Sequence, residues 1–111
     1  MIELGQIMNF RVIAVDFDGT LCINAYPNIG EPNEILIRYL LDEQKRGSKL
    51  ILWTCRCGKY LDEAVAWCLK HGLKFDAVND NIPEATEFFG SNSRKVFAHV
   101  YIDDKNSYMR W

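Results

Sequence analysis

Two aspartates, Asp16 and Asp18, follow an apolar stretch near the start of the chain, in the segment DFDGT at residues 16–20. Carboxylates at the end of a buried strand cost free energy unless they are paired or bind a metal ion. A simple turn is one alternative, because Asp and Gly are common turn residues. An EF-hand loop needs more acidic positions, a later Glu and flanking helices, so the apolar stretch before Asp16 argues against it.

Polar residues follow two further apolar stretches. Thr54 comes after residues 49–53 (KLILW), and Asp103 with Asp104 comes after residues 96–102 (VFAHVYI). If these stretches are parallel strands, their carboxyl ends lie at one edge of a sheet, where doubly wound folds bind ligands. We therefore expect Asp16, Thr54 and the acidic pair to converge at that edge.

Strands and helices alternate along the chain. The pattern predicts buried strands at residues 11–16, 49–53, 75–78 and 96–102. It predicts helices from Asn33 to Arg46, over 61–70 and over 84–89, with a loop at 21–32. In the first helix, Ile35, Leu36, Tyr39 and Leu40 have helical spacing. The alternation predicts an α/β fold: a three-layer α/β/α, Rossmann-like parallel sheet of about four strands, with right-handed crossovers.

The bulk composition is that of an ordinary globular domain. The chain has 111 residues, and we expect one domain over 1–111, with 1–10 a weakly ordered extension and Met8 an alternative start. The net charge of −2 gives no support for nucleic acid as a partner. We expect no membrane span and no signal peptide. The spacing of Cys22, Cys55, Cys57 and Cys68 does not indicate zinc, so we expect free thiols and a cytoplasmic location.

The sequence resembles the haloacid-dehalogenase-like superfamily of phosphohydrolases through four motifs in order, between residues 11 and 105. DFDGT at 16–20 matches the first motif, and Thr54 matches the Ser or Thr that ends the next strand. Lys95 matches the cation before the last core strand, and Asp103-Asp104 matches the acidic pair after it. Arg94 is adjacent to Lys95 and is an alternative for the third motif.

The resemblance implies a role for each aspartate. Asp16 would attack phosphorus and form an aspartyl-phosphate, and Asp18 would act as general acid and base. Mg²⁺ is the implied cofactor, held by Asp16, the backbone carbonyl of Asp18, and Asp103. Asp104 would bind through water or orient the other ligands, and the spacing alone does not rank Asp103 over Asp104.

The same resemblance implies a phosphate-binding set. Thr54 would donate a hydrogen bond to a phosphate oxygen, and Lys95 would neutralise developing charge. Backbone N–H groups of Phe17, Asp18 and Arg56 would complete the cradle. The Arg56 side chain has two interpretations, a substrate-side anion ligand or a surface arginine.

Larger members of that superfamily carry cap domains, and neither gap between the motifs is long enough here to hold one. The resemblance therefore implies a capless enzyme with an open site. Its phosphorylated substrate would be large or nucleotide-like, or a second subunit would shield the site as a homo-oligomer.

Other functions compete with a phosphomonoesterase. A nucleic-acid end-processing or nucleotide phosphatase is compatible with an open site. A non-catalytic Mg²⁺- or phosphate-binding protein on the same fold is a different class, which the presence of both Asp16 and Asp18 argues against. A dehalogenase is disfavoured because that chemistry needs neither Mg²⁺ nor an acid like Asp18.

The remaining histidines and aromatic residues are expected to be structural. We expect His99 in the core or under a helix and His71 at a helix end. The large aromatic residues are expected in the core: Trp53, Trp67, Phe75 and Phe97.

Overall fold

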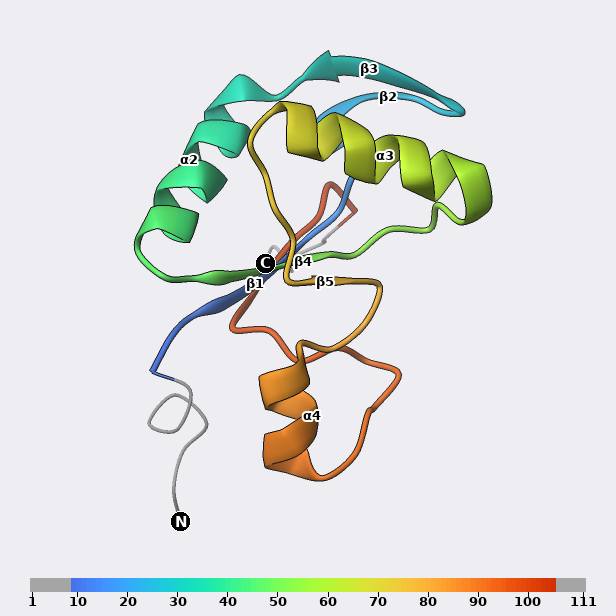
Figure 1. The fold of residues 1–111 in the computed structure, drawn as a ribbon. Coiled ribbons are helices and arrows are strands. Elements are labelled where there is room, and N and C mark those ends of the chain that lie inside the picture. Colours follow the sequence, from blue (N-terminus) through green and yellow to red (C-terminus); the bar gives the residue numbers. More distant parts are fainter. Residues whose placement is uncertain (1–8, 106–111) are drawn as a thin grey trace, which may run out of the picture.

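The computed structural model describes residues 9–105, so the expected extension falls largely outside the described residues. Four parallel strands form the central sheet: β1 (Val12–Val15), β4 (Lys49–Leu52), β5 (Ala77–Val78) and β6 (Val100–Ile102). Their order is β5-β4-β1-β6, so β1 lies between β4 and β6 (Figure 1). The carboxyl ends of β1, β4 and β6 therefore meet at one edge of the sheet.

Helices cover both faces of this sheet. Helices α2 (Glu34–Lys45) and α3 (Gly58–Lys70) lie on one side, and the short α4 (Pro83–Phe89) lies on the other (Figure 1). The predicted three-layer α/β/α architecture is confirmed.

Two clusters of buried hydrophobic side chains form the core, and strand β1 contributes to both, because successive residues of a strand point to opposite faces of the sheet. Ile13 and Val15 pack in the larger cluster, which includes Leu40 of α2 and Ala64 of α3. Val12 and Ala14 pack in the smaller cluster, which includes Ala85 of α4. Burial on both faces explains why β1 has a continuous apolar sequence rather than an alternating one.

The prediction of a loop at residues 21–32 is wrong. Strands β2 (Cys22–Ala25) and β3 (Asn28–Pro32) form an antiparallel hairpin, shown above α3 in Figure 1. Most of the hairpin is exposed, so its sequence lacks the apolar alternation that indicates a strand. Asn24 Oδ1 accepts a hydrogen bond from the Tyr26 N–H, so a residue that indicated a loop orders the turn.

The last strand is shorter than predicted. Only Val100–Ile102 is a strand, because side chains take over part of the hydrogen bonding of the residues before it. Asn81 Oδ1 accepts from the Phe97 N–H, and His99 bonds Val12 through both its backbone N–H and its Nδ1. His99 is exposed, so its expected place in the core is also wrong.

The predicted apolar face of α2 is only partly right, because Leu40 is buried and Leu36 packs against the larger core cluster, but the other two residues are exposed. Ile37 and Leu40 are buried, whereas Ile35 is 87% exposed and Tyr39 38%. Asn33 caps the helix as expected, with its Oδ1 accepting from the Leu36 N–H. Apolar residues occur in succession at 35–37 and 39–41, so the sequence is compatible with more than one buried face of this helix.

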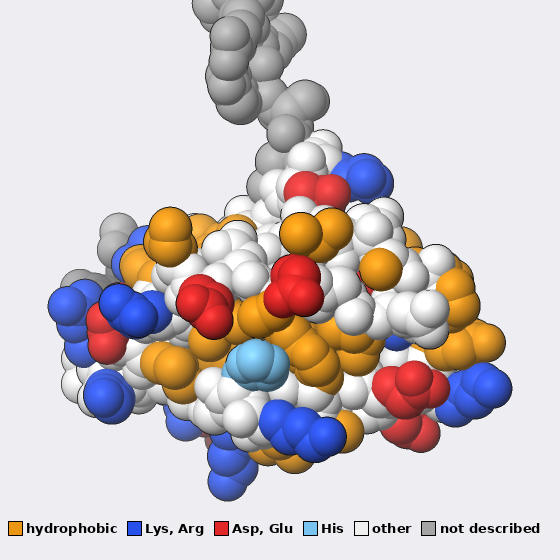
Figure 2. Space-filling model, turned by 90° about the horizontal axis from the view of Figure 1, so that it is seen from above, with side chains coloured by type: hydrophobic (Ala, Val, Ile, Leu, Met, Phe, Trp, Pro, Cys, Tyr) orange, Lys and Arg blue, Asp and Glu red, His pale blue; other side chains and the backbone are white. Residues whose placement is uncertain are grey.

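The side of the molecule that carries α2, α3 and the hairpin is viewed from above in Figure 2. Acidic and basic side chains alternate over it, with hydrophobic groups between them, so this face has no broad field of one sign. None of the helices within residues 9–105 has both the length and the apolar character needed to cross a bilayer.

Candidate active site

The carboxyl edge of the sheet brings together residues from three distant parts of the sequence. Asp16 follows β1, Thr54 lies two residues after β4, and Asp103 follows β6. All three line one hollow of about 410 Å³. The Asp16 N–H donates to the Ile102 carbonyl at 2.9 Å, which ties the start of the DFDGT segment to β6.

Three carboxylates form a compact acidic cluster at this edge of the sheet, and two of them, Asp16 and Asp103, line the hollow. Asp16, Asp103 and Asp104 each offer an oxygen, and these oxygens lie within 4.8 Å of one another. Burial raises the pKa of Asp16 to about 6, the Phe17 N–H opposes this shift, and the charges of Asp103, Asp104 and Asp18 add to it. Because this environment disfavours the ionised form of Asp16, a bound cation would stabilise its carboxylate.

Glycine at position 19 allows the acidic pair to approach the DFDGT turn. Gly19 has a φ of +81°, and a Cβ there would lie 2.3 Å from Asp104 Oδ2. Thr20 Oγ1 accepts a hydrogen bond from the Asp104 N–H at 3.0 Å. Gly19 and Thr20 thus have structural reasons for their place in the motif, in addition to any role of the aspartates.

Thr54 makes one hydrogen bond through its backbone and one through its hydroxyl group. The Thr54 N–H donates to Asn79 Oδ1 at 2.7 Å, and Thr54 Oγ1 accepts from the Arg56 N–H at 3.1 Å. That acceptance leaves the hydroxyl hydrogen to donate to a ligand. The Phe17 N–H, expected in a phosphate cradle, donates to Asp16 Oδ1 at 2.8 Å in this structure.

Arg56 is neither a surface arginine nor a group that faces the acidic cluster. Its side chain is 1% exposed and forms a two-point ion pair with Asp18, with Nη2–Oδ1 at 2.7 Å and Nε–Oδ2 at 2.8 Å. These hydrogen bonds with Asp18 raise the pKa of the guanidinium above its ordinary value. The interpretation as a surface arginine is therefore wrong, because the sequence of a loop does not reveal burial, and the interpretation as a substrate-side anion ligand stays a prediction.

The two lysines near the site are placed differently. Lys95 lies over the Tyr101 ring, 5.9 Å from its centroid, and lines an adjoining hollow of about 290 Å³ with Trp53 and Asp103. Lys105 lines the hollow that contains Asp16 and lies 3.5 Å from Asp104 Oδ2. Lys105 was missed by the sequence analysis, although its position directly after the acidic pair was a usable signal.

Trp53 is only partly core. It packs against the smaller core cluster and also lines both hollows at this edge. The exposed Cys55 lines the larger hollow as well. An aromatic side chain therefore borders the acidic cluster, which the prediction of a wholly structural Trp53 did not anticipate.

The chain is similar to a solved structure described as a conserved protein from Bacteroides thetaiotaomicron. The two sequences are 45% identical over 88% of this chain and 78% of the other, with a TM-score of 0.76. No protein-family model matches the chain, and the comparison with curated proteins gave no match. That description contains no function, so the chemistry has to be inferred from the residues at the sheet edge.

Proposed function

We propose that this chain, which belongs to the same family as the conserved Bacteroides thetaiotaomicron protein, is a phosphohydrolase. It would depend on Mg²⁺ and use Asp16 as its nucleophile. Asp16 carries the proposal: it directly follows strand β1, it can bring an oxygen within 4.8 Å of two further carboxylates, and its pKa is raised to about 6. A half-buried carboxylate at the binding edge of an α/β sheet is a candidate for covalent catalysis. Membership of the haloacid-dehalogenase-like superfamily is part of the same proposal, supported by the four motifs.

The acidic cluster suits a hard divalent cation. Asp16 and one of the acidic pair would hold Mg²⁺ with the Asp18 backbone carbonyl, since Mg²⁺ takes oxygen ligands and retains several waters. The bound ion would neutralise the carboxylates and the phosphate. Asp103 lines the hollow with Asp16, whereas Asp104 is paired with Lys105, so we assign the direct contact to Asp103.

Hydrolysis would proceed by two displacements at phosphorus. Because Asp16 Oδ1 accepts the Phe17 N–H, Oδ2 is the oxygen that attacks. It forms a bond to phosphorus, the ester P–O bond breaks, and the electron pair leaves with the alcohol oxygen, which takes up a proton. Water then attacks the aspartyl-phosphate and loses a proton, which yields inorganic phosphate and restores the Asp16 carboxylate.

Thr54 and the lysines would bind the phosphate. The Thr54 hydroxyl, at the rim of the hollow, donates to a phosphate oxygen. Lys95 reaches phosphate only by leaving the Tyr101 ring, whereas Lys105 already lines the hollow. We propose Lys95 as the charge-neutralising residue, as its sequence position suggests, with Lys105 as the alternative.

Asp18 is the proposed proton-transfer residue, acting first on the leaving alcohol and then on water. In the structure both of its oxygens are bound by Arg56, so it must leave this pair to act. The ion pair also gives Asp18 a structural role. The presence of Asp18 is therefore a weaker argument against a non-catalytic binding protein than the sequence suggested. Turnover separates the two functions, because a binding protein would take up Mg²⁺ without hydrolysing an ester.

The decisive experiment is a screen of phosphomonoesters with and without Mg²⁺, using Asp16→Asn as the blank. We expect Mg²⁺-dependent release of phosphate by the wild type and a loss of several orders of magnitude in the variant, because the amide is not a nucleophile. Near-normal turnover by Asp16→Asn would exclude the covalent mechanism.

A nucleotide phosphatase is a second candidate, favoured by the position of Trp53. Its ring borders the hollow of Asp16 and the adjoining one, where a planar group attached to the phosphate would lie. Faster hydrolysis of nucleoside monophosphates than of sugar phosphates, reduced by Trp53→Leu, would support this candidate. We also propose a cytoplasmic location, since all four cysteines are free.

A further inference from the structure

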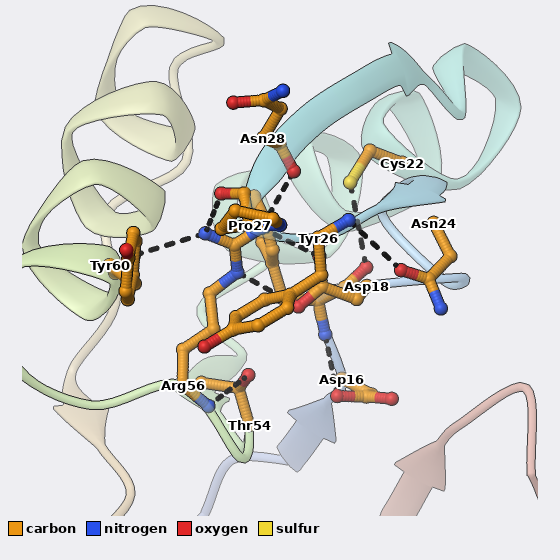
Figure 3. A network of polar contacts seen from close by, with 11 residues as sticks. Asp16, Asp18, Cys22, Asn24, Tyr26, Pro27, Asn28, Thr54, Arg56 and Tyr60 are labelled. Carbon is orange, nitrogen blue, oxygen red and sulfur yellow. Dashed lines mark hydrogen bonds and ion pairs between the residues drawn. The ribbon is translucent and has the colours of Figure 1, made fainter.

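Arg56 is the most highly connected side chain of the site. Each of its five N–H groups has an acceptor: Nε and one N–H of Nη2 bind Asp18, and the other three bind backbone carbonyls. Those carbonyls belong to Pro27, Asn28 and Tyr60 (Figure 3). The guanidinium carbon also lies 5.0 Å from the centroids of both the Phe17 and Tyr26 rings.

These contacts join three parts of the fold: the hairpin, helix α3 and the DFDGT segment. Pro27 and Asn28 lie at the tip of the β2–β3 hairpin, and Tyr60 lies in the first turn of α3. The Tyr26 ring packs on the Tyr60 ring, 5.6 Å between centroids, which adds a second contact between hairpin and helix. The arginine therefore links the hairpin tip to the turn that carries Asp18.

The ion pair has a direct consequence for proton transfer. A carboxylate held at both oxygens by one guanidinium is fixed in orientation, so Asp18 does not turn toward a leaving group while the pair lasts. We infer that Asp18 and Arg56 form a two-position device. In the resting position the two side chains are paired, and in the other position Asp18 reaches the leaving oxygen. Arg56 is a positioning residue, and the hairpin tip moves with it. Asp18 reaches the leaving oxygen only after the pair separates, and this inference rests on the proposed function.

The device predicts a preference among substrates. Phosphate compounds whose leaving group departs without a proton, such as aryl phosphates, react from the resting position. Alkyl phosphates need the acid, so their rate includes the cost of breaking the pair. The enzyme should therefore favour phosphate on an acidic alcohol, a phenol or an enol, over phosphate on a simple alcohol.

The test loosens the hairpin without touching the reacting groups. Tyr26 is 56% exposed, and Tyr26→Leu removes one of the two rings against Arg56 with little risk to folding. We expect the ratio of alkyl to aryl kcat/KM to rise about two- to fivefold, because a cation–π contact of a half-exposed ring is worth roughly 0.5–1 kcal/mol, at 1.36 kcal/mol per factor of ten. Tyr39→Leu is the matched control, since it makes the same substitution at a tyrosine that is 38% exposed and belongs to α2; its ratio should not change.

Two further variants separate this device from a purely structural role. Arg56→Lys keeps the positive charge but loses the planar guanidinium that binds both oxygens of Asp18. In the folded variant it should raise the ratio of alkyl to aryl kcat/KM further. Adding Asp18→Asn to Tyr26→Leu should cancel the rise, because the acid is gone. An unchanged or lower ratio in folded Tyr26→Leu would overturn the device, even with robust Asp16-dependent turnover. Absence of that turnover with both esters would reject the proposed function and this inference with it.

Discussion

At the scale of single residues, the site is defined by charges that oppose one another. Asp16 carries a raised pKa mainly because it is half-buried, with Asp103 and Asp104 adding repulsion. Asp18, two residues further on, has its charge compensated by Arg56. The two aspartates of one short motif thus have opposite environments: one lacks a positive partner among residues 9–105, and the other has a strong one. Such a division is typical of functional sites, where environments separate the roles of neighbouring carboxylates.

The raised pKa of Asp16 predicts the pH dependence of stability of the metal-free protein. The reference pKa of 3.8 becomes about 6 on folding, so the folded state binds this proton more tightly than the unfolded state. The free energy of unfolding therefore falls as pH rises from about 4 to 6, and the cost persists above that range. In EDTA, Asp16→Asn should melt at a higher temperature than wild type at pH 7.5 and at a similar one near pH 4.

Melting curves in EDTA across this pH range check the sign, and repeating them with Mg²⁺ is the control. The ion should raise the wild-type Tm more than that of Asp16→Asn. Equal Tm values for the two proteins at pH 7.5, both in EDTA, would contradict the proposed environment of Asp16.

The acidic pair supports a second prediction. Asp103 lines the hollow and accepts the Lys105 N–H, whereas Asp104 is exposed and paired with the Lys105 ammonium. Asp103→Asn should raise the Mg²⁺ concentration for half-maximal activity more than Asp104→Asn does. An outer partner of a metal site is typically worth about 10–100-fold in affinity, which sets the effect expected for Asp104. Titration of activity with Mg²⁺ checks the order, and the reverse order would exchange the two roles.

At the scale of elements, the DFDGT turn must be close to the end of β6. Gly19→Ala should weaken Mg²⁺ binding and lower stability by roughly 1–2 kcal/mol or more, because the residue has positive φ and its Cβ would meet Asp104. Gly90→Ala is the matched control: its φ is +71°, and a Cβ there meets nothing within 4 Å. Both variants should lose Tm, but only Gly19→Ala should shift the Mg²⁺ midpoint. Equal midpoints would show that Asp104 does not need this approach.

The elements that the sequence predicted are those whose burial gives them a clear pattern. Strand β1 and helix α2 have continuous or periodic apolar residues, and Asn33 marks the helix start. The convergence of Asp16, Thr54 and Asp103 followed from the parallel topology alone. The hairpin was not predicted because it is largely exposed, and its residues are those of a loop.

Arg56 shows the limit of reading function from sequence. Its burial depends on carbonyls of the hairpin and of α3, about thirty and four residues away along the chain. No periodicity in the sequence encodes such a set of backbone acceptors, so both interpretations of the residue missed it. A short element that the sequence did not reveal thus determines how a predicted catalytic residue is held.

At the scale of the whole molecule, the site lies at the edge of a single three-layer unit. Within residues 9–105 the only structure inserted after the DFDGT segment is the short hairpin, and its tip is bound to Arg56. The hollow around Asp16 is bordered by Trp53, Thr54 and Cys55 of the β4–α3 connection. A large phosphorylated group should therefore reach Asp16 without the opening of a lid domain.

Substrate size tests this openness when the leaving group is held constant. Free phosphotyrosine and the same phosphotyrosine inside a nonapeptide release the same phenol, so their chemistry at phosphorus is equal and only their bulk differs. We expect their kcat/KM values to agree within about tenfold, since the open edge imposes no closure that bulk would obstruct. Size-exclusion chromatography at the assay concentration gives the oligomeric state for the same sample. A loss of a thousandfold or more for the peptide would mean that the edge is covered in solution. If dilution to monomer then restored the peptide rate, a second copy of the chain would be the cover; if it did not, the hairpin would be closing over bound phosphate.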